Sequence, residues 1–156
     1  MKHLLSGAAL LALAACAHTP PVNTTLDGIR TARLAASCPN PPSKPYRSGA
    51  EPANSVADVE LSSVPLTNDA VGRSLNLRRL TVAPNGVISW HDHDARTGFA
   101  LVISGELGEF RNDCGTTAKR IAGDVVQEIP GVAHFWRNLS STDAIILVFD
   151  ASKPEK

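Results

Sequence analysis

The sequence predicts a small all-β protein, either a sandwich or a barrel, built as a single domain. From residue 56 onward, short runs rich in apolar and β-branched residues alternate with turn residues at the regular spacing typical of such folds. No stretch of this region keeps a helical period. The 156 residues are enough for one hydrophobic core and too few for two comfortable ones.

Residues 1–15 are predicted to be a signal peptide. Their apolar run, residues 4–15, is too short to span a bilayer. It ends in Leu13-Ala14-Ala15-Cys16, which resembles the lipobox of bacterial lipoproteins. The resemblance implies cleavage before Cys16, acylation of that residue and a lipid anchor in the cell envelope. Because Ala17 follows and not an aspartate, the periplasmic side of the outer membrane is expected. An ordinary secretory signal is the alternative.

Residues 16–55 are predicted to form a proline-rich tether ahead of a domain at 56–152. The tether holds seven prolines and few large apolar side chains. Such a segment buries too little surface to offset the entropy lost on ordering. It would hold the domain away from the membrane.

Cys38 and Cys114 are the two cysteines besides Cys16. In a compartment that permits disulfides, an even pair favours a bridge between the end of the tether and a turn of the domain. Closing so long a loop stabilises by about 4 kcal/mol in the chain-entropy model. Two free thiols are the alternative.

Strands are predicted at residues 56–65, 73–82, 87–93, 99–103, 106–112, 118–121, 125–129, 132–137 and 145–149. Pro84-Asn85-Gly86 predicts a tight turn between the second and third of these strands. The last strand is apolar at every position, which predicts cover on both faces.

The second predicted strand changes its apolar face partway along. Leu75 and Leu77 share one face, and the apolar residues then move by one position to Leu80 and Val82. Such a slip predicts a β-bulge across Arg78-Arg79.

Three histidines are the candidate metal ligands. His91 and His93 are two residues apart, so on a strand they share one face. His134, from a distant strand, would complete a three-nitrogen site. The remaining histidines are His3 in the signal peptide and His18 in the tether. The alternative is that the three are hydrogen-bonded histidines of a metal-free barrel.

Two glycine-rich and histidine-rich patterns resemble the paired motifs of the cupin family. The first comprises Gly86, His91, His93, Gly98 and Gly105, and the second comprises Gly123-Asp124, Ile129-Pro130-Gly131, His134 and Asn138. The resemblance implies a double-stranded β-helix, or jelly roll, whose mouth holds a metal ion. His91, His93 and His134 match ligand positions, whereas the glutamate position falls on Gly98. Three imidazoles suit Fe, Zn, Ni or Cu.

Further polar residues are placed near the expected site. Arg96 could clamp a substrate carboxylate, although a solvated loop arginine is the alternative. Asn138 is expected to hold backbone or neighbouring site residues. Glu109 and Glu128 alternate with apolar neighbours and are expected on solvated faces, and either would become a general-base candidate if it pointed inward.

Aromatic and aliphatic side chains are expected to pack outside the pocket. Trp90 and Trp136 are predicted to lie between sheets or in a dimer interface. Phe99, Leu101 and Ile103 form an apolar stripe that is compatible with a homodimer, or with the core alone.

Charge and motif content leave two classes of function. Lys and Arg number 15 and Asp and Glu number 15, so no basic surface is available for nucleic acid. The first class is a metal-dependent, oxygenase-like enzyme acting on a small molecule, with the metal as Lewis acid or O₂ site. The second is a non-catalytic small-molecule or metal binding module of the envelope.

Overall fold

The computed structural model describes residues 27–36, 38, 52–68 and 72–153. The predicted signal peptide, Cys16 and much of the predicted tether lie outside these residues. The elements are α1 (Asp27–Arg30), β1 (Arg33–Leu34), β2 (Asn54–Pro65), β3 (Ser74–Asp92), β4 (Arg96–Ser104), β5 (Glu106–Arg111), β6 (Ala118–Ile121), β7 (Asp124–Glu128), β8 (Ala133–Asn138) and β9 (Ala144–Ser152). Within the described ranges, no helix has the length and apolar character needed to cross a bilayer.

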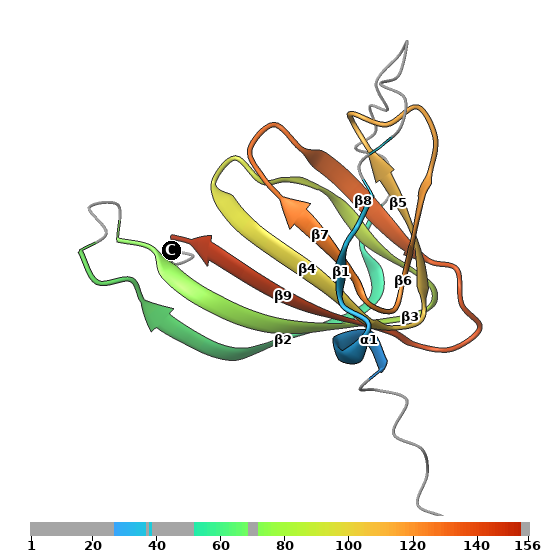
Figure 1. The fold of residues 1–156 in the computed structure, drawn as a ribbon, viewed down its shortest axis with the longest axis horizontal. Coiled ribbons are helices and arrows are strands. Elements are labelled where there is room, and N and C mark those ends of the chain that lie inside the picture. The colour runs from blue at the N-terminus through green and yellow to red at the C-terminus, as the bar shows by residue number, and fades with distance from the viewer. Residues whose placement is uncertain (1–26, 37, 39–51, 69–71, 154–156) are drawn as a thin grey trace, which may run out of the picture.

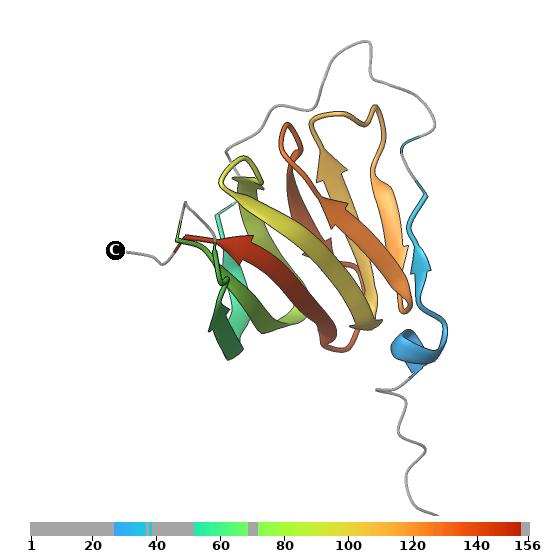
Figure 2. The same cartoon turned by 60° about the vertical axis from the view of Figure 1, so that its left-hand side comes forward.

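The strands curl into an open half-barrel, which confirms the all-β prediction (Figure 1). Their order is β1-β7-β4-β9-β3-β8-β5-β6, and β2 pairs with β3 alongside this path. Figure 2 shows the strands facing one another across the interior as two layers. The apolar core between them consists of Leu80, Val82, Ala100, Val102, Leu107, Val126, Trp136, Ala144, Ile146 and Val148.

β3 belongs to both layers, which corrects the predicted turn at residues 84–86. Residues 74–82 pair with β9, and residues 87–92 pair with β8. Asn85 has φ of 60°, and a Cβ on Gly86 would meet Ala83 O at 2.8 Å. The turn residues therefore bend a continuous strand and do not end it, because both flanks find partners.

The predicted bulge in β3 is also wrong in position. β3 runs in unbroken register against β9 over residues 74–82, whereas the irregularity lies in β2 between Glu60 and Ser62. The apparent slip has another cause. Asn76 and Arg78 line a cavity on the interior side, in phase with buried Leu80. The inner face of β3 thus changes from apolar to polar along one strand.

β9 is covered fully on one face only, contrary to the prediction. Ile146 and Val148 are buried, whereas Phe149 is 38% exposed. Phe149 lies opposite Phe99 of β4, which is 48% exposed. Ile103, from the predicted stripe, is buried. The outer side of the β3–β9–β4 layer therefore presents large apolar side chains.

The segment around β1 lies at the seam of the half-barrel, by which we mean the place where the two ends of the strand order, β1 and β6, come together. β1 pairs in parallel with β7. Beyond it, Cys38 forms a disulfide with Cys114 in the loop between β5 and β6, with a Cα–Cα distance of 5.5 Å. The disulfide thus joins the segment after β1, at one end of the strand order, to the loop before β6, at the other end of the strand order.

Candidate metal centre

The structure brings the three candidate histidines together. His91 lies near the end of β3 opposite His134 of β8, and His93 follows directly after β3. The backbone N–H of His93 donates to Val132 O at 3.2 Å, which keeps this residue beside β8. The three ring centroids lie 4.7 to 4.9 Å apart in edge-to-face arrangements.

The Nε2 atoms of the three rings converge. His134 Nε2 lies 2.9 Å from His93 Nε2 and 3.2 Å from His91 Nε2. His91 Nδ1 donates to Ser89 O at 2.8 Å, and His134 Nδ1 contacts Glu109 Oε1 at 2.6 Å. With protons on Nδ1, both Nε2 atoms carry only lone pairs, which cannot hydrogen-bond to each other. Nitrogens bound about 2.1 Å from one ion and at right angles would lie about 3 Å apart. The residues therefore fit a divalent ion.

Glu128 is a fourth potential ligand, and its predicted solvated position is wrong. It is 5% exposed at the end of β7, and its Oε2 lies 3.8 Å from His93 Nδ1. Potential ligand atoms of His91, His93, His134 and Glu128 all lie within 4.8 Å of one another. Alternation along β7 does not identify the inward face, because Val125 and Val126 are both apolar.

Glu128 stands directly across from Gly98, the position where the family resemblance implies a glutamate. The two residues are register partners in β7 and β4. A Cβ on Gly98 would collide with Phe149 O and lie 2.7 Å from Asp150 Cα. The close approach of β9 therefore leaves no room for a side chain at Gly98, and the neighbouring strand supplies the carboxylate.

Burial governs the protonation of the cluster. Burial, and then the neighbouring His134, lowers the pKa of His91 to about 4 and that of His93 to about 3. Burial also raises the pKa of Glu128 to about 7. His91 and His93 are therefore neutral at physiological pH, which is the form that binds metal.

Glu109 is also buried, so its predicted solvated position is wrong. Oε2 accepts from Arg120 Nε at 2.7 Å, and Oε1 accepts from His134 Nδ1 and from Arg111 Nη1 at 3.2 Å. Burial alone would raise the pKa of Glu109, but the hydrogen bond with His134 and the two guanidinium charges outweigh burial and lower it to about 2. Glu109 therefore fixes the proton of His134 on Nδ1.

Trp136 packs in the core between the two layers, as predicted, but it also lies beside the cluster, contrary to the prediction that it lies outside the pocket. It is buried and lines a small inner cavity with His91 and Glu128. Its Nε1 lies 3.0 Å from His134 Nδ1, but the hydrogen bond from that nitrogen goes to the closer carboxylate of Glu109. Residues 134 and 136 are two apart on β8 and so share a face. Trp90 is half-buried.

A polar chamber of about 550 Å³ lies at the open end of the half-barrel. Arg78 borders both this chamber and the inner cavity of about 30 Å³. Arg96 Nη1 lies 3.9 Å from Asp150 Oδ2, and Arg78 Nη2 lies 3.4 Å from the same oxygen. The chamber is lined by Asp58, Glu60, Ser63, Ser74, Asn76, Arg78, Arg96, Asp150, Ser152 and Lys153. Arg96 thus lines a cavity near the histidines.

Asn138 ties β8 to the backbone around it. Its side-chain amide donates to Val82 O and to Thr142 O, each at 2.8 Å, and its oxygen accepts from Ser140 N. These contacts place Asn138 among the residues that hold the strands in place.

A curled β-sheet with converging histidines at its interior defines the class: a small jelly-roll protein with a potential metal centre. The family model described as the cupin domain matches residues 78–150. Residues 78–150 of the chain therefore match the cupin domain. Comparison with curated protein sequences gives no match.

Solved structures share the fold at low sequence identity. The cupin domain of Cnp3 from Schizosaccharomyces pombe has a TM-score of 0.51 and 10% identity, over 64% of this chain and 66% of that chain. KdgF from Halomonas sp. has a TM-score of 0.50 and 15% identity, over 65% and 81%. An uncharacterized conserved protein with a double-stranded β-helix domain from Klebsiella pneumoniae has a TM-score of 0.50 and 24% identity, over 69% and 82%.

Proposed function

We propose that this protein binds one divalent transition-metal ion through His91, His93 and His134, with Glu128 as the carboxylate of the centre. The observation that carries the proposal is the convergence of three Nε2 atoms, with 2.9 and 3.2 Å between neighbours. Imidazole ligands with one carboxylate favour Fe, Zn, Ni or Cu.

We further propose a metal-dependent, oxygenase-like enzyme acting on a small polar molecule. The bound metal would supply a Lewis acid or an O₂ site. Glu128 supports catalysis if it does not bind the metal, because burial raises its pKa in the metal-free site to about 7, which suits proton transfer near neutral pH. Besides a metal ion, an enzyme would need an acid or a base placed in the site, and Glu128 is such a group.

The chamber supports a small polar substrate. Its wall carries three basic side chains and three acidic ones, so it offers both hydrogen-bond donors and acceptors. These are Arg78, Arg96 and Lys153, and Asp58, Glu60 and Asp150. A substrate carboxylate would pair with Arg96, which lines the wall.

The alternative is a binding module without turnover, and one observation favours it. The inner cavity beside His91 and Glu128 measures about 30 Å³, which is room for about one water molecule. A molecule larger than water therefore enters this cavity only if side chains that line it move.

Metal content and turnover separate these possibilities. Untagged protein should contain about one metal ion per chain, and H134A should contain almost none. O₂ consumption should follow addition of one of a panel of small carboxylates, thiols and phenols. E128Q should lose turnover, with little loss of metal if Glu128 is a base, and with lost metal if it is a ligand. Retained metal in H134A would overturn the metal site, and no turnover with any compound would favour the binding module.

We also propose that Cys16 is acylated and anchors the domain to the envelope, on the periplasmic side of the outer membrane. The sequence around Cys16 supports this, as does a disulfide between Cys38 and Cys114, which forms in oxidising compartments. In membrane fractionation, wild-type protein should sediment with membranes and C16A should be released. Membrane association of C16A equal to that of wild type would overturn the anchor.

A further inference from the structure

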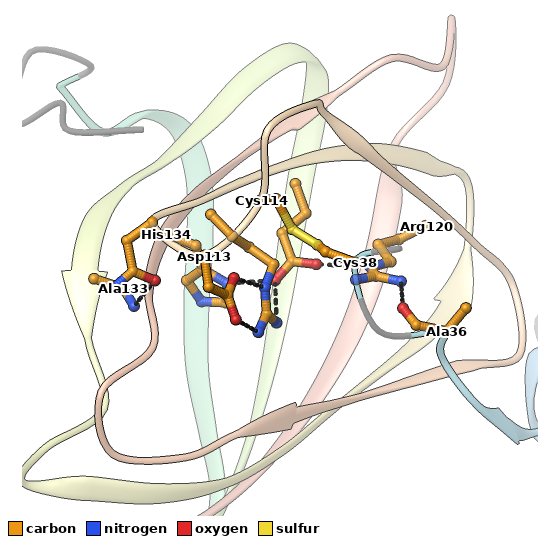
Figure 3. Close-up of a disulfide and its surroundings, with 10 residues drawn as sticks. Ala36, Cys38, Asp113, Cys114, Arg120, Ala133 and His134 are labelled. Atoms are coloured by element: carbon orange, nitrogen blue, oxygen red, sulfur yellow. Dashed lines mark hydrogen bonds and ion pairs between the residues drawn. A yellow bond between two sulfur atoms is a disulfide. The ribbon is translucent and has the colours of Figure 1, made fainter. Parts of the chain in front are cut away.

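A buried charge cluster stands behind His134 (Figure 3). Glu109 is fully buried and uses its two oxygens differently. Oε1 contacts His134 Nδ1 at 2.6 Å, and Oε2 accepts from Arg120 Nε at 2.7 Å. Arg120 is 5% exposed. The orientation of the His134 ring therefore depends on Glu109, and that of Glu109 depends on Arg120.

Both arginines of the cluster continue to the Cys38–Cys114 disulfide. Arg120 Nη1 donates to Ala36 O at 3.1 Å, two residues before Cys38. Arg111 donates to both carboxylate oxygens of Asp113, the neighbour of Cys114, at 2.7 Å each. The two sides of the disulfide thus connect through one guanidinium each to the same buried carboxylate, that of Glu109. Figure 3 shows Ala36, Arg120 and Asp113 around the disulfide.

The segment that carries Ala36 has few other attachments. β1 has two residues, and Leu34 is 65% exposed. Backbone hydrogen bonds join Arg33 N to Gly123 O and Ala35 N to Val125 O, and an ion pair of Arg33 with Asp124 is partly exposed. Arg33 is exposed and Asp124 is buried, so solvent screens this pair on one side only. Ala35 also packs against the core, and the covalent bond at Cys38 adds a further constraint on where Ala36 O lies.

We propose that the Cys38–Cys114 disulfide controls the metal centre, with Arg120 and Glu109 as positioning residues for His134. This inference rests on the proposed metal site. A dithiol reductant would supply two electrons and two protons, break the S–S bond to give two thiols, and itself become a disulfide. The segment is then held only by its ladder with β7 and by the packing of Ala35, Ala36 O is no longer fixed against Arg120, and His134 is held less firmly. Loss of such a support typically lowers metal affinity about 10- to 100-fold.

The test measures affinity for Zn²⁺, by competition with a chromogenic chelator, and the ligand-field spectrum of bound Co²⁺. The comparison uses the full mature chain with the disulfide formed and the C38S/C114S variant, so that no thiol reagent competes for metal. C38S/C114S should bind 10- to 100-fold more weakly with an altered Co²⁺ spectrum. R33A, which breaks only the exposed pair with Asp124, is the matched control and should bind as wild type does.

R120K is the second variant and keeps the disulfide. A lysine retains the positive charge but cannot reach Glu109 and Ala36 O together as a guanidinium fork does. R120K should therefore bind as weakly as C38S/C114S, and the triple variant should show little further loss. Circular dichroism reports whether each variant is folded. If C38S/C114S is not, R120K tests the link through Arg120, and wild type with its disulfide reduced and its thiols then alkylated tests the disulfide itself.

The outcomes separate the two proposals. Equal, tight binding by wild type, C38S/C114S and R120K would overturn the disulfide control and leave the metal site intact. Wild type that binds neither Zn²⁺ nor Co²⁺ would overturn the metal site itself, and the control with it.

Discussion

The three histidine rings are held to different degrees. His134 is fully buried and bonded to Glu109, whereas His91 is half-buried and donates to a backbone carbonyl, Ser89 O. His93 Nδ1 is buried with no hydrogen-bond partner within the described part of the chain, and Glu128 is 3.8 Å away. The His134 and Glu109 pair is therefore the firmly held part of the centre, whereas Glu128 contacts it only at the longer distance of 3.8 Å.

Replacing Glu109 by glutamine should weaken metal binding and the fold together. The variant keeps the shape but leaves Arg111 and Arg120 without their shared negative charge. Breaking a buried ion pair costs about 3–5 kcal/mol of stability, and loss of the partner of His134 should lower metal affinity about 10- to 100-fold. Zinc titration calorimetry and urea denaturation measure the two effects. Unchanged affinity in E109Q would contradict the role given to Glu109.

The stability of the metal-free protein should depend on pH in two opposing ways. His91 and His93 have pKa values lowered to about 4 and 3, so the unfolded chain takes up protons first and stability falls as pH drops below about 6.5. Glu128 has its pKa raised to about 7, so the stability contributed by its neutral form is lost as pH rises from about 4.5 through 7.

The variant E128Q isolates the contribution of Glu128, because glutamine stays neutral at every pH. The measurement is thermal unfolding of metal-free wild type and E128Q from pH 4 to 8. As pH rises from 4.5 to 7, wild type should lose stability relative to E128Q. A constant difference across this range would show that Glu128 does not titrate there.

At the scale of elements, the close approach of β4 to β9 decides which strand carries the carboxylate. Gly98 lies against Phe149 O and Asp150 Cα of β9. Its cross-strand partner Glu128 has room to point inward from β7. The centre therefore depends on β7 being paired correctly with β4.

Gly98→Ala should destabilise the protein by about 3 kcal/mol, since the new methyl group meets backbone atoms that cannot turn aside. Gly108→Ala is the matched control, because its methyl group would meet flexible side-chain atoms at 3.2 to 3.3 Å. Chemical denaturation compares the two. Equal losses in both variants would show that the approach of β9 does not exclude a side chain at Gly98.

The strands could be predicted from sequence, because apolar and polar residues alternate along them. The histidine cluster could be predicted from the two-residue spacing of His91 and His93 and from the second motif around His134. The inward orientation of the Glu109 and Glu128 side chains could not be predicted, since alternation gives the period of a strand but not which of its faces is covered. The polar inner face of β3 was obscured for a related reason: Asn76 and Arg78 occupy interior positions beside a chamber, where an apolar pattern is expected. The predictions that failed are therefore those for polar residues of the site itself.

At the scale of the whole molecule, the described residues leave the outer side of the β3–β9–β4 layer without cover. Leu75, Phe99 and Phe149 are 50%, 48% and 38% exposed on neighbouring strands. Contiguous apolar surface of this kind marks interaction sites. We propose that two copies of the chain pair through this face.

Phe99→Asp should convert such a dimer to a monomer, because a charge at the centre of an apolar interface is left without a partner. Sedimentation velocity measures the change, and metal content should stay the same because Phe99 points away from the interior. Leu139→Asp is the control, since Leu139 is 50% exposed in the loop after β8. A wild-type protein that is monomeric at all concentrations would contradict the pairing.

The anomalous-difference map of a crystal of the untagged protein soaked with Zn²⁺ tests the central claim most directly. The expected result is one strong peak per chain, within bonding distance of Nε2 of His91, His93 and His134. A map without a peak at this position, from a protein that also takes up no Fe, Ni or Cu, would contradict the metal centre.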